Sequence, residues 1–216
     1  MRIPRRLFLT FALALAGAAS ASSQEGGKIR VACVGDSITF GACVADRGNN
    51  CYPAVLGKLL GDRYEVRNFG VSGSTLLKKG DKPYWKEKAF TQATDFNPSI
   101  VVIKLGTNDT KPQNWKHKGE IEADARAMVR HFRELAGKPK VFVALPVPVL
   151  KPNFGINQEG VAQEIPVLRK VAKEEGAGLI DLHSAVAAPD LFDKDGVHPN
   201  AAGAKKIAET VHAALK

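Results

Sequence analysis

Ser37 is the residue of this chain with the clearest chemical potential, because it closely follows an apolar run at Ile29–Val34. A serine at the carboxyl end of a first β-strand lies where an open α/β sheet places its reacting groups. A serine hydroxyl is a weak nucleophile, however, and it needs a base within hydrogen-bond distance that a third group orients. The rest of the chain must therefore supply a base and an acid if Ser37 is to react.

A candidate base and its partner lie together near the C-terminus, where Asp195 and His198 are three positions apart in a Gly-containing turn. Pro199 disfavours helical geometry at His198, so we expect the pair in a loop above the sheet. There Asp195 can hold one imidazole nitrogen while the other nitrogen faces Ser37. The rival base is His183, which ends a predicted strand and lacks a carboxylate at the right spacing.

A serine that attacks an acyl carbonyl also needs preorganised hydrogen-bond donors for the oxyanion of the tetrahedral intermediate. Two further segments, Asn68–Thr75 and Gly106–Asp109, follow the second and third predicted strands of the chain. The candidate donors are the backbone N–H of Ser37, the backbone N–H of Gly73 and the side-chain amide of Asn108. Glycine at position 73 lets the backbone approach a substrate closely.

Simpler interpretations of these residues are available. Ser37 could only cap a helix, as serine often does. Ser72 is a second candidate nucleophile, but Ser74 stands where a G-x-S-x-G elbow needs its last glycine. Asp36 and Asp109 are expected to orient loops through hydrogen bonds rather than to act as catalysts.

The segments that would position these residues alternate between strand-like and helix-like patterns along the chain. Short strands that are mostly β-branched or apolar and that alternate with helices predict a parallel sheet covered on both faces. The predicted strands are Ile29–Val34, Tyr64–Phe69, Ile100–Leu105, Val141–Leu145 and Leu179–Leu182. The predicted helices are Tyr52–Leu60, Glu120–Leu135, Gly160–Glu175 and Ala201–Leu215, with a weaker one at Trp85–Thr94.

The N-terminus has the pattern of a secretory signal peptide. A positively charged start precedes the apolar run Leu7–Ala19, and a small-x-small cleavage site ends at Ala21. Arg5 and Arg6 also resemble a twin-arginine signal. The run is too short to span a bilayer and no second one follows, so no stable membrane insertion is expected. The predicted parts are a signal peptide at 1–21, a flexible linker at 22–27 and one globular domain at 28–216.

The charge and the cysteines of the chain limit the classes of partner and cross-link that we expect. The 216 residues carry a formal net charge of +9, but an exported protein seldom meets nucleic acid, so an anionic polysaccharide, an envelope surface or a solvated basic face is expected instead. Cys43 and Cys51 flank a short polar loop and could form a disulfide, with two free thiols as the alternative. Cys33 lies in an apolar run and is expected to be buried. No Cys/His spacing suits a metal site.

Four short blocks of this chain, taken in order, resemble the signature blocks of the SGNH (GDSL-type) hydrolases. They are Gly-Asp-Ser at 35–37, Asn-x-Gly-x-x-Gly at 68–73, Gly-x-Asn-Asp at 106–109 and Asp-x-x-His at 195–198. The resemblance covers the chain from about Lys28 to the C-terminus. It implies a flavodoxin-like, three-layer α/β/α sandwich with a five-stranded parallel sheet. It also implies that Ser37 is the nucleophile, that Gly73 and Asn108 donate to the oxyanion, and that Asp195 and His198 complete the triad.

We therefore expect an exported serine esterase, periplasmic or extracellular, that needs no cofactor or metal. Its expected substrate is an ester of a small molecule or polysaccharide, most specifically an O-acetylated carbohydrate. A lysophospholipase, arylesterase or thioesterase of the same family is the alternative enzyme, and a non-catalytic carbohydrate-binding protein is the alternative of another class. The sequence leaves open the oligomeric state and whether Tyr84, Trp85 or Trp115 line the substrate site.

Overall fold

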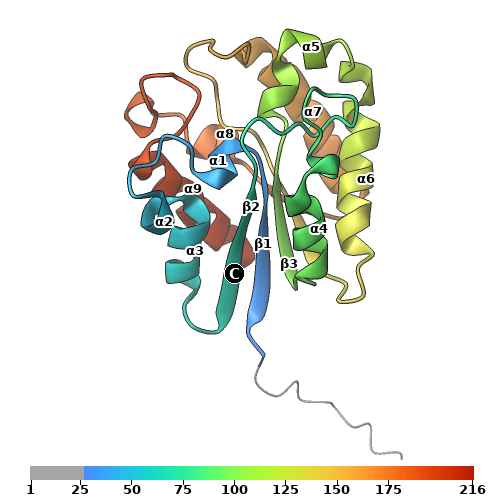
Figure 1. Ribbon diagram of the computed structural model, residues 1–216, viewed down its shortest axis with the longest axis vertical. Helices are drawn as coiled ribbons and strands as arrows, with labels where there is room; N and C mark the ends of the chain where they lie inside the picture. The colour runs from blue at the N-terminus through green and yellow to red at the C-terminus, as the bar shows by residue number, and fades with distance from the viewer. Residues whose placement is uncertain (1–26) are drawn as a thin grey trace, which may run out of the picture.

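The computed structural model describes residues 27–216, and its centre is a five-stranded parallel sheet of strand order β2-β1-β3-β4-β5 (Figure 1). This order is the flavodoxin-like one, in which the first strand lies inside the sheet and its carboxyl end adjoins the point where the strand order reverses. The predicted three-layer α/β/α fold is therefore confirmed. The strands are β1 (Ile29–Gly35), β2 (Tyr64–Gly70), β3 (Ile100–Lys104), β4 (Lys140–Ala144) and β5 (Gly178–Ile180).

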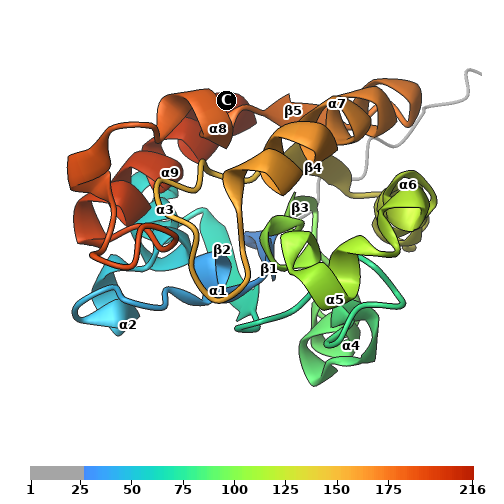
Figure 2. The same cartoon turned by 90° about the horizontal axis from the view of Figure 1, so that it is seen from above.

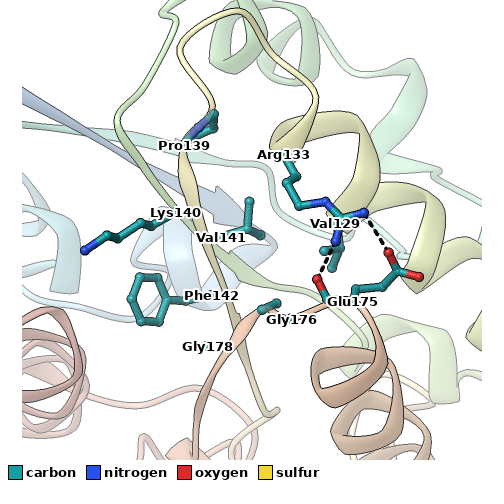
Figure 3. A pocket seen from close by; sticks show the side chains of 10 residues that line it. Val129, Arg133, Pro139, Lys140, Val141, Phe142, Glu175, Gly176 and Gly178 are labelled. Carbon is teal, nitrogen blue, oxygen red and sulfur yellow. Dashed lines mark hydrogen bonds and ion pairs between the residues drawn. The ribbon is translucent and has the colours of Figure 1, made fainter.

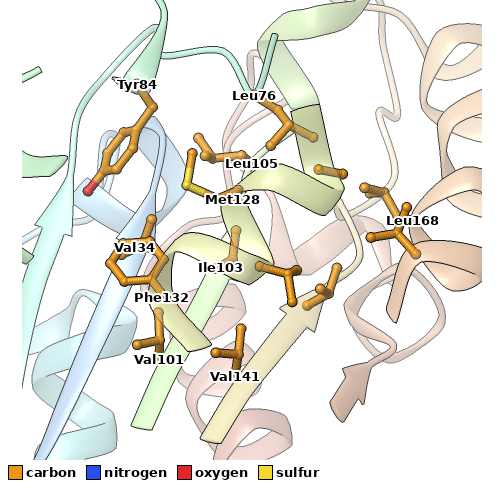
Figure 4. Close-up of a cluster of buried hydrophobic side chains, with 14 of the residues drawn as sticks. Val34, Leu76, Tyr84, Val101, Ile103, Leu105, Met128, Phe132, Val141 and Leu168 are labelled. Carbon is orange, nitrogen blue, oxygen red and sulfur yellow. The ribbon is translucent and has the colours of Figure 1, made fainter. Parts of the chain in front are cut away.

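Alternate side chains of the central strands enter two separate hydrophobic cores, one on each face of the sheet. In β1, Ala32 and Val34 belong to one core, whereas Val31 and Cys33 belong to the other. This is the two-residue period of a strand that is buried on both sides. Figure 4 shows the first core, in which side chains of the sheet pack against Met128, Phe132 and Leu168.

The helices form the two outer layers of the sandwich, as the view from above shows (Figure 2). Side chains of α4, α6 and α7 share the core shown in Figure 4, and those of α3, α8 and α9 share the other core. The long helices are α3 (Tyr52–Leu60), α4 (Lys88–Asp95), α6 (Ile121–Arg133), α7 (Gln158–Glu174) and α9 (Ala201–Leu215). The short ones are α1 (Ser37–Phe40), α2 (Arg47–Asn50), α5 (Pro112–Trp115) and α8 (Leu182–Ala185), with 3-10 turns at Tyr84–Lys86, Thr107–Thr110, Lys118–Glu120 and Pro189–Leu191.

Most predicted boundaries lie within two residues of the observed ones, and two of the differences have clear local reasons. The helix predicted from Trp85 begins only at Lys88, because Tyr84–Lys86 forms a separate 3-10 turn. The last strand ends at Ile180, because the side chain of Asp181 accepts a hydrogen bond from the backbone N–H of Ser184 and so caps α8.

The predicted signal peptide at 1–21 lies outside the described residues, as does nearly all of the linker at 22–27. Within the part of the chain that the structure describes, no helix has both the length and the apolar character needed to cross a membrane.

Candidate active site

Ser37 is held at the carboxyl edge of the sheet by a short helix and a buried ion pair. The carboxylate of Asp36 caps α1, accepting from the backbone N–H of Ile38 at 2.9 Å. The same carboxylate is paired with Lys104 at the end of β3, whose Nζ lies 3.0 and 3.2 Å from its two oxygens. Both side chains of this pair are buried, and Asp36 therefore orients the serine loop as predicted.

A close approach of two segments lets α1 sit against the end of β2. A Cβ atom on Gly70 would lie 2.2 Å from the backbone nitrogen of Phe40, a distance that no real side chain tolerates. The first glycine of the second sequence block is thus required by packing, because no side chain fits between the two backbones. It keeps the serine helix and the Gly73 loop side by side.

The structure brings Ser37, His198 and Asp195 into one hydrogen-bonded chain. Ser37 Oγ lies 2.9 Å from His198 Nε2, and His198 Nδ1 lies 2.6 Å from Asp195 Oδ2. The other oxygen of Asp195 accepts from the backbone N–H groups of Val197 and His198, at 2.8 and 2.9 Å. The loop that carries the histidine is therefore organised around the carboxylate that orients its ring.

The pKa of Asp195 is lowered from its ordinary value. Burial acts to raise this pKa, but the backbone N–H and imidazole of His198, together with the N–H of Val197, more than offset that effect. The carboxylate is consequently ionised at neutral pH. Such a fixed negative charge favours an imidazolium on its neighbour whenever the histidine gains a proton.

Gly73 and Asn108, predicted as oxyanion donors, line one pocket with Ser37 and His198. Gly73 has a positive φ of 85°, which favours glycine, and its N–H has no backbone or side-chain acceptor among the described residues. The side-chain amide of Asn108 donates to the backbone carbonyl of Ser74 at 3.1 Å, which leaves its second N–H for another acceptor. The pocket has a volume of about 270 Å³.

Asp109 connects the two loops that carry these donors. Its carboxylate accepts from the backbone N–H groups of Leu76 and Leu77, at 3.0 and 2.7 Å, and is fully buried. Burial raises the pKa of Asp109 to about 7, although the two amide bonds oppose the rise. The structure thus places Asp109 in the loop-orienting position predicted for it.

The aromatic residues left open by the sequence do not line this pocket. Tyr84 is fully buried and donates to the carbonyl of Phe69, and Trp85 donates to the carbonyl of Leu76. Trp115 packs against the hydrophobic core. These aromatic side chains hold loops against the core, so their contacts are those of packing and not of a sugar-binding surface in this pocket.

The rival catalytic residues differ in their positions. His183 contacts Gln158 and the carbonyl of Pro146 at its two ring nitrogens and is not among the pocket residues. Ser72 does line the pocket beside Gly73, but the hydroxyl that contacts a histidine there is that of Ser37.

The disulfide considered between Cys43 and Cys51 does not form, and both thiols are free. The two side chains have separate partners, because Cys51 is buried next to the amide of Asn68 while Cys43 is exposed. The Cys43 thiol donates to Asp195 Oδ2 across 3.7 Å. The prediction that Cys33 is buried is confirmed.

Sequence patterns missed four residues that complete the pocket wall: Ala42, Lys111, Phe154 and Ile156. Phe154 is the most conspicuous, because its side chain is 59% exposed and its ring centroid lies 5.9 Å from that of His198. It lies in the connection between β4 and α7, an irregular segment whose composition carries no signal for a binding site. Its φ of 53° is uncommon for a bulky residue.

A second hollow, of about 220 Å³, lies between α6 and the amino ends of β4 and β5 (Figure 3). Its charged side chains include Arg133 and Glu175, which are already paired with each other. It lies at the amino ends of these strands and contains none of the predicted site residues.

Comparison with known proteins agrees with the fold and the sequence blocks. The model of the GDSL-like lipase/acylhydrolase family matches residues 33–206, and this chain belongs to that family. The chain is 44% identical over 207 residues to an acetylxylan esterase of Xylanibacter ruminicola, a match covering 87% of this chain and 43% of that protein. It is 25% identical over 247 residues to a multidomain esterase of Ruminococcus flavefaciens, covering 96% of this chain and 31% of that one. The chain thus spans less than half the length of these relatives.

Solved structures show the same fold. An aryl esterase of M. smegmatis superimposes with a TM-score of 0.74 and 21% identity, covering 86% of this chain and 97% of the other. A carbohydrate acetylesterase of Sinorhizobium meliloti gives a TM-score of 0.73 at 20% identity, with coverage of 87% and 98%.

Proposed function

We propose that this chain hydrolyses carboxylic esters through an acyl-enzyme on Ser37, and that its substrates are O-acetylated carbohydrates. The observation that carries the proposal is the hydrogen-bonded chain from Ser37 through His198 to Asp195, which opens into a pocket also lined by Gly73 and Asn108. A nucleophile, an oriented base and separate donors for an oxyanion are the parts that acyl transfer needs.

The reaction proceeds in two halves on these residues. His198 Nε2 takes the hydroxyl proton of Ser37 while Ser37 Oγ attacks the ester carbonyl. Asp195 stabilises the imidazolium that forms on His198. The N–H groups of Ser37 and Gly73 and the amide of Asn108 donate to the developing oxyanion. His198 then protonates the departing alcohol, and water repeats the sequence to release the acid from the acyl-serine.

The size of the pocket supports a short acyl group. Its volume of about 270 Å³ falls below the range of about 300–1,000 Å³ that is typical of sites for drug-sized ligands. Ala42 and Ile156 supply apolar walls against which a short acyl group can pack. An acetyl group suits such a site better than an octanoyl group.

The surroundings of His198 support a carbohydrate on the alcohol side of the ester. The exposed ring of Phe154 offers a flat apolar face beside the base, on which the C–H face of a pyranose ring can lie. The 44% identity to the acetylxylan esterase of Xylanibacter ruminicola also supports an acetylated polysaccharide as the substrate of this chain. The signal peptide predicted from the N-terminal sequence fits this substrate, because an exported enzyme would meet such polymers outside the cytoplasm.

The test is the hydrolysis of nitrophenyl esters and acetylated xylan by the wild-type protein and by Ser37→Ala. Loss of more than about a thousandfold in kcat is expected for the variant, because the remaining pocket only binds and polarises the ester. Ser184→Ala, on an exposed helix end away from the pocket, is the matched control and should retain activity. Unchanged hydrolysis by Ser37→Ala would refute the assignment of the nucleophile.

Comparison of acyl chains separates the acetylesterase from the alternative enzymes. We expect faster turnover of nitrophenyl acetate than of nitrophenyl octanoate, with acetate released from acetylated xylan. Faster turnover of the octanoyl ester would favour a lysophospholipase or arylesterase. A wild-type protein that binds xylan but hydrolyses neither ester would instead be a non-catalytic binding protein.

A further inference from the structure

Three side chains with different metal-binding atoms converge on the outer side of the catalytic histidine. They are the thiol of Cys43, the carboxylate of Asp195 and the imidazole of His198, and their donor atoms all lie within 4.8 Å of one another. Cys43 Sγ is 3.7 Å from Asp195 Oδ2, which in turn is 2.6 Å from His198 Nδ1. Sequence spacing could not indicate this set, because Cys43 and Asp195 are 152 positions apart.

We propose that Cys43, Asp195 and His198 form a binding site for a thiophilic divalent cation of the Zn²⁺ class, and that its occupation switches the esterase off. Sulfur, nitrogen and oxygen donors together are the set that Zn²⁺ prefers, whereas Mg²⁺ and Ca²⁺ require oxygen donors alone. The inference goes beyond the proposed function, because ester hydrolysis by itself gives no role to Cys43.

Two of the three distances between the donors can be compared with those of a zinc site, and the third, from sulfur to nitrogen, is within 4.8 Å. With tetrahedral angles and the usual zinc–ligand lengths, sulfur and oxygen lie about 3.5 Å apart, and nitrogen and oxygen about 3.3 Å apart. The sulfur–oxygen distance of 3.7 Å already fits. The nitrogen and oxygen, now 2.6 Å apart across a hydrogen bond, need to separate by about 0.7 Å, which a small side-chain rotation supplies.

A cation can reach these atoms from solvent, because Cys43 is exposed at the protein surface. Asp193 adds a second carboxylate whose charge acts on the Cys43 thiol, and its side chain accepts from the backbone N–H of Asp195 at 3.4 Å. Two carboxylates, those of Asp195 and Asp193, therefore act electrostatically on the thiol and favour the approach of a cation. A water molecule can take the fourth position of the cation.

The cation would block catalysis through the proton on the imidazole. Coordination takes the lone pair of His198 Nδ1, so the single proton of the neutral ring must be on Nε2. A nitrogen that already carries a proton cannot accept the proton of Ser37, and acylation stops. One proton is released overall, from the Cys43 thiol, which becomes a thiolate ligand.

The first test measures inhibition of nitrophenyl acetate hydrolysis by Zn²⁺, with each variant compared with its own metal-free rate. Wild type should be inhibited, and EDTA should restore its rate. Cys43→Ser should need at least tenfold more Zn²⁺ for half-inhibition, because it loses the thiolate ligand. Cys51→Ser, which removes a buried thiol away from Asp195, should match wild type. Mg²⁺ should have no effect.

The second test is independent of activity. Co²⁺ added to the wild-type protein should give the charge-transfer absorbance of a cobalt–thiolate bond, and Cys43→Ser should abolish this absorbance. The cobalt result stays interpretable even if the proposed substrate is wrong, so failure of the metal site and failure of the esterase assignment can be told apart. Equal sensitivity of wild type and Cys43→Ser to Zn²⁺, or a wild-type protein without the thiolate absorbance, would overturn the proposal.

Discussion

Replacement of Lys104 by methionine should destabilise the fold strongly, because it leaves a buried charge without its partner. Lys104 and Asp36 have side chains that are 1% and 0% exposed, and the ammonium also donates to Thr107 Oγ1 at 2.7 Å. After the substitution the Asp36 carboxylate keeps one hydrogen bond, which it accepts from the backbone N–H of Ile38. Loss of one partner from a buried ion pair costs about 3–5 kcal/mol of unfolding free energy.

The assay is urea unfolding at pH 7, followed by circular dichroism, with midpoints compared at an unchanged m-value. Lys140→Met is the matched control, because Lys140 is exposed at the start of β4 and should change stability by less than about 0.5 kcal/mol. In the double variant Asp36→Asn/Lys104→Met, the charge is removed while the cap of α1 keeps its acceptor. That variant should recover at least about 2 kcal/mol relative to Lys104→Met.

Two results would refute this reasoning. A loss of less than about 1 kcal/mol in Lys104→Met would mean that water or a rearrangement solvates the Asp36 carboxylate. A double variant less stable than Lys104→Met would mean that the destabilisation comes from lost packing rather than from an unpaired charge.

Three further predictions concern other parts of the molecule. Asn108→Ala should lower kcat about 10²- to 10³-fold with little change in KM, since its amide acts on the oxyanion; a change in KM alone would contradict this. Phe154→Ala should raise KM more for acetylated xylo-oligosaccharides than for nitrophenyl acetate, and equal effects in Phe154→Ala and the control Phe40→Ala would exclude a sugar platform. Hydrogen bonds from Arg130 lower the pKa of Glu175 to about 2, so its stabilisation should be present above about pH 4.5 and lost as pH falls towards 2. Urea midpoints of Glu175→Gln should then vary less over this range than those of wild type.

The strands and long helices could be predicted because their cause is local. Short β-branched runs such as Ile100–Lys104 can be buried on both faces only in a covered parallel sheet, and α9 shows its apolar stripe at helical spacing. The short helix α1 was not predicted, because four residues carry no periodicity. It is defined instead by the side chain of Asp36 and by the tertiary contact at Gly70.

The central site residues could be predicted because each lies at a fixed point after a strand or before a helix. Phe154 and Cys43 could not, because nothing in their immediate sequence fixes where their loops fold. Phe154 is next to His198 only through the path of the β4–α7 connection, and Cys43 faces Asp195 only through a turn at positive φ. Residues on such loops become visible as parts of a site only in three dimensions.

The β4–α7 connection and the loop that carries His198 are joined along their backbones. The N–H groups of Leu150 and Lys151 donate to the carbonyl of Gly196, and the Asn153 amide donates to that of Asp195. A displacement of the β4–α7 connection would therefore also shift the loop that carries His198, which couples the proposed sugar contact at Phe154 to the proposed base. To change the alcohol that the proposed esterase accepts, the Phe154 side chain should be exchanged while the length of its loop is kept. An insertion in the β4–α7 connection would displace His198 before it changed the specificity for the alcohol.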